Sequence, residues 1–249
     1  MSEIPELRVA TREAKNKLDE VAVVIELTLI SIIQAMALGV LVTFSIPVIA
    51  EYHFEYWLYV VLGLLAILIF WSRTLIHTLS FIGWPLEMGH TYIYFAATLV
   101  EGLLLSQVNN PAAWFALSTV YFALAWFLYY WDRRVMMSRA EEYNTETERK
   151  LHNDMIADQE QNLKFYMPAG VAFNALAWWL IVTFPNLFIE EHWHIVLAVW
   201  SIVVGIWYVR EGGIILHRRQ GWILYRYTRQ RLPIVTEEEE LLRPAQTPR

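Results

Sequence analysis

Long apolar segments separated by charged blocks constrain this chain more than any other feature of its sequence. Of its 249 residues, 57% are hydrophobic and 18% are charged, and the charges gather between uncharged runs. A helix needs about 20 mostly apolar residues to cross the hydrocarbon core of a bilayer. We expect six such spans, at about residues 21–44, 56–72, 90–108, 112–131, 166–184 and 195–209. The sequence therefore predicts an all-α, polytopic membrane protein, a bundle of six transmembrane helices.

The positions of the basic residues predict how this bundle is oriented. All 19 Lys and Arg residues lie in four blocks, which hold four, one, six and eight of them: residues 1–20, the turn with Arg73, residues 132–165 and residues 210–249. Three intervening turns hold none: those around residues 51–55, 107–112 and 185–194. Because loops rich in Lys and Arg stay in the cytoplasm, we predict a multi-pass protein with cytoplasmic N- and C-termini.

The spans divide the chain into three regions. Residues 1–20 read as a polar cytoplasmic lead-in, and residues 21–209 as the transmembrane domain, which includes a charged, helical, cytoplasmic linker at 132–165. Pro47 is expected just past the end of the first span. Residues 210–249 are expected to form a cytoplasmic surface helix followed by an acidic tail whose composition predicts disorder.

The segment 214–232 has the composition of an amphipathic helix that lies on a membrane surface. Its basic residues are interleaved with Trp and Tyr: Arg218, Arg219, Arg226, Arg229 and Arg231. Such a helix binds anionic lipids of the inner leaflet. A helix that binds a partner protein is the alternative.

One carboxylate falls in the middle of the third span. Glu101 lies nine residues past Tyr92, or about 14 Å along a helix, near the midplane of the bilayer core. Gln34 and Asn174 lie at comparable or slightly shallower depth in other spans. These three residues are the candidates for a transport path, with Glu101 handling protons or cations; the alternative is a polar contact that holds helices together. In either case we expect Glu101 to point into the bundle, because facing lipid costs about 2.5–3.5 kcal/mol.

Charged residues near the inner boundary are candidates for ion pairs. Glu26, Arg73 and Arg210 lie at that level, and Glu26 could pair with Arg73. The alternative is ordinary anchoring, in which long basic side chains reach the headgroups.

Histidines provide the candidates for metal or haem chemistry. His53, His192 and His194 lie beside four carboxylates in two outer turns, and imidazole with carboxylate suits zinc, copper, nickel or iron. His77 and His90 flank an inner turn, where imidazoles could serve as axial haem ligands. Neither spacing matches a known motif, so we expect no bound metal and no cofactor.

Two further observations exclude classes of site. The chain has no cysteine, which excludes disulfides, thiolate metal sites, iron–sulfur clusters and catalytic thiols. The tripeptide Asn110–Pro111–Ala112, which water channels carry twice, occurs once. Here it reads as a helix N-cap followed by Pro at the first helical position.

Three functions remain open at this stage. The first is a channel or a proton- or cation-coupled transporter. The second is a non-catalytic scaffold or accessory subunit of a larger membrane complex, and the third is a membrane metal or redox protein that uses the histidines. We expect a homo-oligomer or a subunit of a membrane complex, with no enzymatic activity, and the net charge of −6 argues against nucleic acid as a partner.

Overall fold

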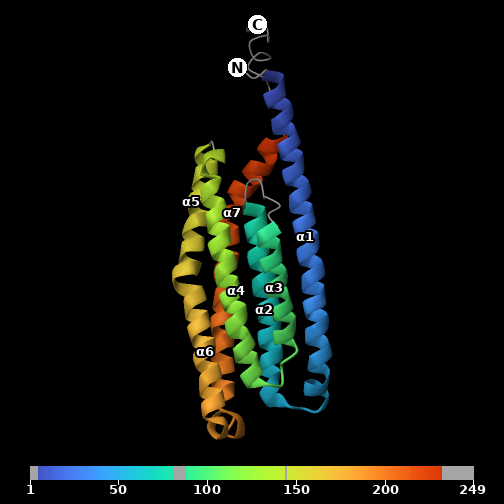
Figure 1. The fold of residues 1–249 in the computed structure, drawn as a ribbon, viewed down its shortest axis with the longest axis vertical. Helices are drawn as coiled ribbons and strands as arrows, with labels where there is room; N and C mark the ends of the chain where they lie inside the picture. The colour runs from blue at the N-terminus through green and yellow to red at the C-terminus, as the bar shows by residue number, and fades with distance from the viewer. Residues whose placement is uncertain (1–4, 81–87, 144, 232–249) are drawn as a thin grey trace, which may run out of the picture.

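Helices account for most of the chain that the computed structural model describes, which is residues 5–80, 88–143 and 145–231. They form an elongated bundle (Figure 1). Seven α-helices follow one another in these ranges: α1 Pro5–Ala50, α2 Phe54–Ser80, α3 Met88–Leu105, α4 Pro111–Ser138, α5 Glu146–Gln161, α6 Met167–Thr183 and α7 His194–Arg231. Three short helical turns join them: η1 at Ala140–Glu142, η2 at Asn162–Tyr166 and η3 at Asn186–Glu190. The same ranges contain no β-strand.

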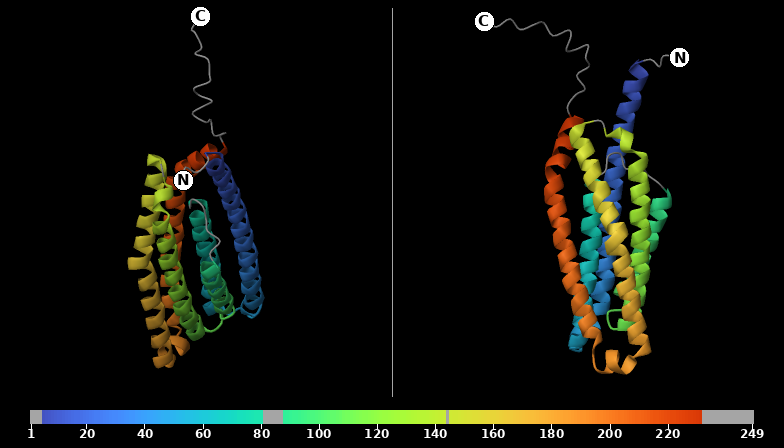
Figure 2. Two further views of the ribbon diagram at one scale, coloured as in Figure 1. Left: turned by 45° about the horizontal axis from the view of Figure 1, so that its top comes forward. Right: turned by 90° about the vertical axis from the view of Figure 1, so that its left-hand side faces the viewer.

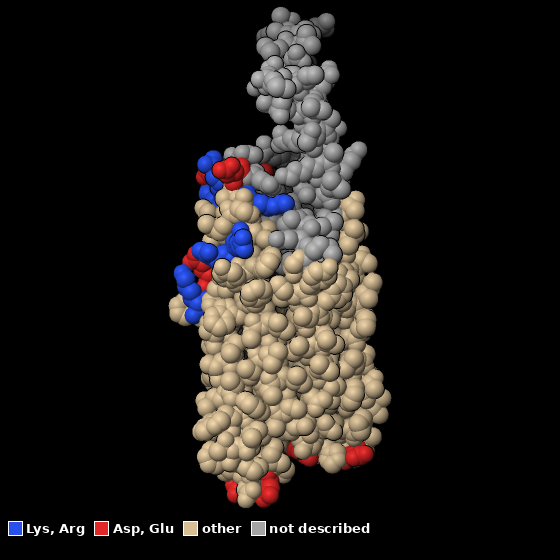
Figure 3. Space-filling view, viewed as in Figure 1, with Lys and Arg blue, Asp and Glu red and all other residues tan. Residues whose placement is uncertain are grey.

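The apolar character of these helices agrees with the sequence analysis. Five helical stretches in the described part of the chain are long and apolar enough to cross a membrane: Leu27–Ala50, Phe54–Ser80, Pro111–Ser138, Glu146–Thr183 and His194–Leu224. A sixth apolar stretch, Tyr92–Leu105 in α3, is shorter. On the face shown in Figure 3, a wide band without charged residues separates the charges at the two ends. These features are consistent with an integral membrane protein.

The two ends of the bundle differ in charge. One end holds the turn between α1 and α2 and the turn at η3, and the face in Figure 3 shows only acidic charges there. Residues 51–55 and 185–194 at this end contain four Glu and no Lys or Arg. At the opposite end, Figure 3 shows basic and acidic side chains together.

The end of α1 departs from the prediction. Pro47 was expected beyond the first span, but it lies inside α1, which continues to Ala50. Proline removes one backbone hydrogen bond and its ring crowds the preceding turn. Here it falls in the last turn of the helix, where the backbone of Glu51 still bonds to the carbonyl of Pro47 at 3.0 Å. The helix therefore ends only at the following turn.

Most of residues 132–165 are helical, as the sequence predicts, and they continue the neighbouring helices. Helix α4 runs on to Ser138, and a short turn leads into α5. A capping box starts α5: Thr145 Oγ1 accepts from the backbone of Glu148, and the Glu148 carboxylate accepts from the backbone of Thr145. Helix α5 then continues through η2 into α6 as one 38-residue helical stretch (Figure 2). The charged residues thus extend both α4 and α6, and the turn at η1 joins the two extensions.

The predicted sixth span and the start of the basic tail form a single helix. The sequence analysis separated a span ending near residue 209 from a surface helix beginning near 214, whereas α7 runs unbroken from His194 to Arg231. The residues between the two predicted elements include Gly212 and Gly213 but no proline, so nothing there removes a backbone hydrogen bond. In Figures 1 and 2 the C-terminal end of α7 leans toward α1.

Packing divides the bundle into helix pairs. Helix α2 packs along α7, α4 packs along α6, and α1 packs against α2 and α3. The main apolar core includes Leu41 from α1, Tyr59 from α2, Phe115 from α4 and Ile181 from α6. Gly170 permits the close approach of α6 to α4, because a Cβ there would lie 2.3 Å from the ring of Phe122. The turn before α4 confirms the predicted cap, since Asn110 accepts from the backbone of Ala113 at 3.1 Å.

Candidate functional site

The carboxylate of Glu101 points into the bundle, as predicted. Its side chain is fully buried, and Gln34 on α1 donates from Nε2 to Glu101 Oε2 at 3.3 Å. Glu101 also lies near enough to the half-buried Tyr121 of α4 for an electrostatic interaction. Among the described residues, Oε1 of Glu101 and Oε1 of Gln34 have no hydrogen-bond partner. The pair therefore joins α1 to α3 through a single hydrogen bond.

Asn174 does not share this contact. Its Nδ2 donates to the carbonyl of Gly170 at 2.7 Å within α6, and its side chain lines a cavity that Glu101 does not line. The reason is the packing of the helices, because α6 lies against α4 while Glu101 lies between α1 and α3. Similar depth placed the three predicted residues in one slab, but the structure brings together only Gln34 and Glu101.

A cavity of about 450 Å³ occupies the interior of the bundle. It lies between the α2–α7 pair and the α4–α6 pair, and residues of α2 from Leu62 to His77 line it. That stretch rises about 22 Å along the helix. Most of the wall is aromatic or aliphatic, with Trp114 and Phe173 toward the acidic end of the bundle.

One side of this cavity is thinly covered. Its lining includes Trp200, Val204 and Trp207 of α7, which are 57%, 41% and 40% exposed, and Ala169 of α6, which is also exposed. Helices α6 and α7 make few contacts with each other, although they are consecutive. These residues therefore border the cavity and the apolar outer surface of the bundle at once.

Ion pairs close the other end of the cavity. Arg73 NH1 lies 3.3 Å from Asp158 Oδ1, and Arg219 NH2 lies 3.5 Å from Asp158 Oδ2. Arg219 Nε and Arg218 NH2 each lie 2.7 Å from a carboxylate oxygen of Asp154. We call Arg73, Asp154, Asp158, Arg218 and Arg219 the ionic cluster. It ties α5 to α2 and to α7.

Hydrogen bonds extend the ionic cluster to α4 and to η2. The hydroxyls of Tyr129 and Tyr208 lie 3.1 Å apart, and Tyr208 donates to Asn162 Oδ1. Asn162 Nδ2 in turn donates to the carbonyl of Asp158 at 2.8 Å. The guanidinium of Arg73 lies 4.2 Å from the centre of the Tyr208 ring, a cation–π distance. The π turn that begins at Asn162 thus lies in contact with the polar end of the cavity, and such turns are frequent at functional sites.

Helices α2, α4 and α5 also meet at His77. Its Nδ1 lies 3.2 Å from Gln159 Nε2, and its Nε2 lies 3.5 Å from Asp132 Oδ2. All three side chains line the cavity. With the ionic cluster they give the cavity one polar end and leave the rest apolar.

No family model matches this chain, and no curated protein or solved structure shows a significant match to it.

The inner-boundary candidates have different outcomes. Arg73 is in an ion pair, but its partner is Asp158 of the predicted linker. The side chain of Glu26, the partner first considered, lies outside the described part of the structure. Arg210 is exposed on α7.

The arginines assigned to the lipid surface also divide. The side chain of Arg219 is only 3% exposed and lies against Asp154. The sequence analysis expected this side chain to extend toward the lipid headgroups, and the structure places it inside the bundle instead. The half-exposed Arg218 shares the same carboxylate. These two ion pairs form because α7 continues alongside α5, which carries the acidic partners of Arg218 and Arg219. The side chains of Arg226, Arg229 and Arg231 lie outside the described part of the structure.

The histidines do not assemble a metal site in the part of the chain that the structure describes, where no group of three or more His, Asp or Glu residues is placed to hold an ion. His53 lies between Glu51 and Glu55 on the surface. His194 is buried instead, with its Nδ1 3.1 Å from the hydroxyl of Tyr59, and the ring of His192 lies 5.9 Å from it. The side chain of His90 is outside the described residues.

Sequence reasoning missed the α5 side of the ionic cluster. Asp154, Asp158 and Asn162 recur at every fourth position, which places them on one face of a helix. That periodicity was the available signal, because polar side chains that repeat along one helix face, with no basic residue among them, indicate a face with a basic partner on another helix. The sequence analysis instead treated residues 132–165 as a linker and assigned no packing partner to this face.

Proposed function

We propose that this chain is a six-span integral membrane protein whose N- and C-termini lie in the cytoplasm. The five long apolar stretches and the shorter α3 each cross once. Helix α3 has 18 residues, a rise of about 27 Å, which is close to the bilayer core thickness of about 30 Å. Turns free of Lys and Arg at one end of the bundle support the orientation.

We further propose that the protein binds a small apolar or amphiphilic molecule taken from the membrane. The cavity of about 450 Å³, apolar along its length and polar at one end, carries this proposal. Small-molecule sites are typically concave spaces of about 300–1,000 Å³ with mostly apolar walls and a few polar groups. The thinly covered side between α6 and α7 offers a route from the acyl chains.

Proton or cation transport through Glu101 is the second candidate. The observation that favours it is the complete burial of a carboxylate in a membrane-length apolar helix, which is a costly placement. Glu101 does not line the cavity, however, and its hydrogen bond from Gln34 joins two neighbouring helices. A structural role in holding α1 against α3 accounts for that geometry more simply.

Filling the cavity tests the ligand-binding proposal. Ala125 of α4 lines the cavity, and Ala123, two residues earlier on the same helix, is exposed and does not. Ala125→Trp should abolish retention of apolar small molecules by protein purified in detergent, measured by native mass spectrometry. Ala123→Trp is the matched control and should retain them. Equal retention by the wild type and both variants would contradict the proposal.

Ser201→Trp provides a second way to fill the same space. Ser201 lines the cavity from α7, so this variant approaches the site from the opposite helix pair. It should reproduce the loss seen with Ala125→Trp. Retention in both filled variants, when each is folded and monodisperse, would contradict the proposal.

A further inference from the structure

We infer that the ligand is a single-chain amphiphile with an anionic head, a long-chain carboxylate, whose head binds Arg73 and whose chain lies along the apolar part of the cavity. This inference rests on the proposed ligand-binding function. It adds the chemical class of the ligand and the direction in which the ligand lies.

The first argument is an unused donor on a buried guanidinium. Arg73 lines the cavity and its side chain is only 10% exposed. Its NH1 donates to Asp158, but its Nε has no hydrogen-bond partner among the described residues. Buried N–H groups are nearly always paired, because leaving one unpaired is costly. This donor faces Gly212 of α7, where an added Cβ would lie 3.8 Å from it, so a small rotation of the Arg73 side chain would bring it to a ligand carboxylate at this end of the cavity.

The second argument is charge. The ionic cluster joins three guanidinium groups to two carboxylates, so these linked groups carry one excess positive charge. Asp132 also lines the cavity, 3.5 Å from His77 Nε2, and its charge is balanced locally when His77 is protonated. Buried charges are tolerated when they are paired. An anionic head beside Arg73 would balance the cluster, whereas a cationic head would add to the excess.

The third argument is shape. From Arg73 to Leu62, the lining of the cavity along α2 is aliphatic or aromatic over a rise of about 16 Å. Side chains from α4 and α6, such as Phe122 and Phe173, form the facing wall. An apolar space of this length beyond one charged group accommodates most of one extended hydrocarbon chain.

The test compares three ligands that share a 16-carbon chain and differ only in the head. Protein freed of lipid in a non-ionic detergent is titrated with palmitate, hexadecanol or hexadecylamine, and native mass spectrometry measures the bound fraction. Palmitate should bind at least about tenfold more tightly than hexadecanol, because a hydrogen bond to a charged group contributes at least this much. Hexadecylamine should bind most weakly.

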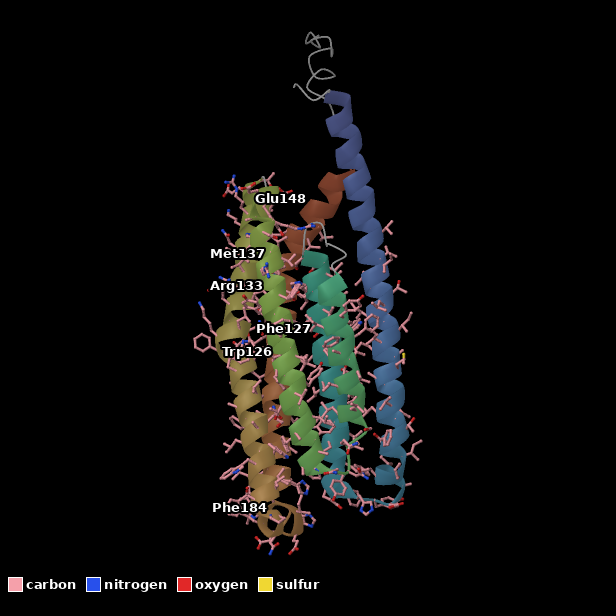
Figure 4. All side chains as sticks on the ribbon, in the orientation of Figure 1. Trp126, Phe127, Arg133, Met137, Glu148 and Phe184 are labelled. Atoms are coloured by element: carbon pink, nitrogen blue, oxygen red, sulfur yellow. The ribbon has the colours of Figure 1, made fainter. Side chains whose placement is uncertain are left out.

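Two arginine variants locate the head. Arg73→Gln should remove the preference for palmitate over hexadecanol, while Arg73→Lys, which keeps the charge, should retain it. Arg133→Gln is the matched control. Arg133 lies on α4 (Figure 4) and does not line the cavity, and its guanidinium lies 3.0 Å from the carboxylate of Glu160 on α5. This variant should behave as the wild type does.

The possible results separate the two proposals. Equal binding of palmitate and hexadecanol, lost in Ala125→Trp, would overturn the anionic head and leave the ligand-binding function standing. Preference for hexadecylamine would overturn the anionic head as well. Failure of all three ligands to bind saturably would overturn both proposals. Because the wild-type comparison alone decides the head group, the test stands even if Arg73→Gln does not fold.

Discussion

Arg73 on α2 and Asp158 on α5 lie 3.3 Å apart, from NH1 to Oδ1, although 85 positions separate them in the chain. Both side chains are nearly buried, and Arg219 of α7 reaches the same carboxylate. The contact joins three helices at one end of the cavity. It also determines which donors of Arg73 remain free to meet a ligand.

Removing the charge of Asp158 should destabilise the protein strongly. Asp158→Asn keeps the shape of the side chain but leaves Arg73 without its carboxylate. Breaking a buried ion pair by removing one partner costs about 3–5 kcal/mol, because the other charge remains buried. We expect the free energy of unfolding, measured by titration with a denaturing detergent, to fall by about this amount.

Glu160→Gln is the control for that experiment. Glu160 also lies on α5 and pairs with Arg133 at 3.0 Å, but both side chains are about one-third exposed. Exposed pairs contribute little to stability because water screens them. This variant should therefore unfold nearly as the wild type does. If Asp158→Asn were equally harmless, the ionic cluster would not hold α5 in place.

The contact between Gln34 and Glu101 should behave as a structural pair. Glu101→Leu should lower the free energy of unfolding by about 1–3 kcal/mol, since the amide of Gln34 loses its buried acceptor. Combining Glu101→Leu with Gln34→Leu should recover part of this loss, because neither polar group then remains unpaired. A double-mutant cycle in the same detergent measures the recovery.

Transport through Glu101 makes a different prediction for the milder variant. Glu101→Gln keeps the shape and hydrogen bonding of the side chain and removes its charge. If Glu101 is structural, proteoliposomes with this variant should show the same proton or cation flux as those with the wild type. Loss of a measurable wild-type flux in this variant, with folding intact, would favour the transport candidate.

The topology can be tested by labelling single introduced cysteines, because this chain has no cysteine of its own that would also react. Single cysteines at Glu55, Asn109 and Glu191 should react with a membrane-impermeant thiol reagent added outside intact cells. Asn109 and Glu191 lie in turns free of Lys and Arg, and Glu55 lies in the first turn of α2 beside the third such turn. A cysteine at the exposed Lys150 of α5 should react only after the membrane is opened. Labelling of Lys150→Cys in intact cells would contradict the cytoplasmic orientation.

The helices could largely be predicted from the sequence, because each depends on local composition. The apolar run of α3 and the Asn110 cap of α4 are signals that neighbouring residues carry. The ends of the helices were harder to predict from the sequence. Pro47 predicted an end to α1 that the structure places three residues later, and the predicted boundary between residues 209 and 214 lies inside the continuous α7.

The site could be predicted only in part, because it depends on which helices are neighbours. Gln34 and Glu101 were found by depth, and their helices turned out to pack together. Asn174 has a similar depth but lies on the far side of α4. The partner of Arg73 could not be found while residues 132–165 were treated as a linker, because Asp158 reaches Arg73 only when α5 packs beside α4 and α7.

Photo-crosslinking tests the central claim, the binding of an amphiphile inside the bundle, most directly. Membranes that contain the protein are incubated with palmitate bearing a diazirine at its methyl end, irradiated and mapped by peptide mass spectrometry. We predict crosslinks to the apolar lining near Trp114, Leu62 and Phe173, absent in Ala125→Trp and present in Ala123→Trp. Crosslinks confined to exposed residues outside the cavity, such as Trp178 and Trp179, and unchanged by Ala125→Trp would contradict the account.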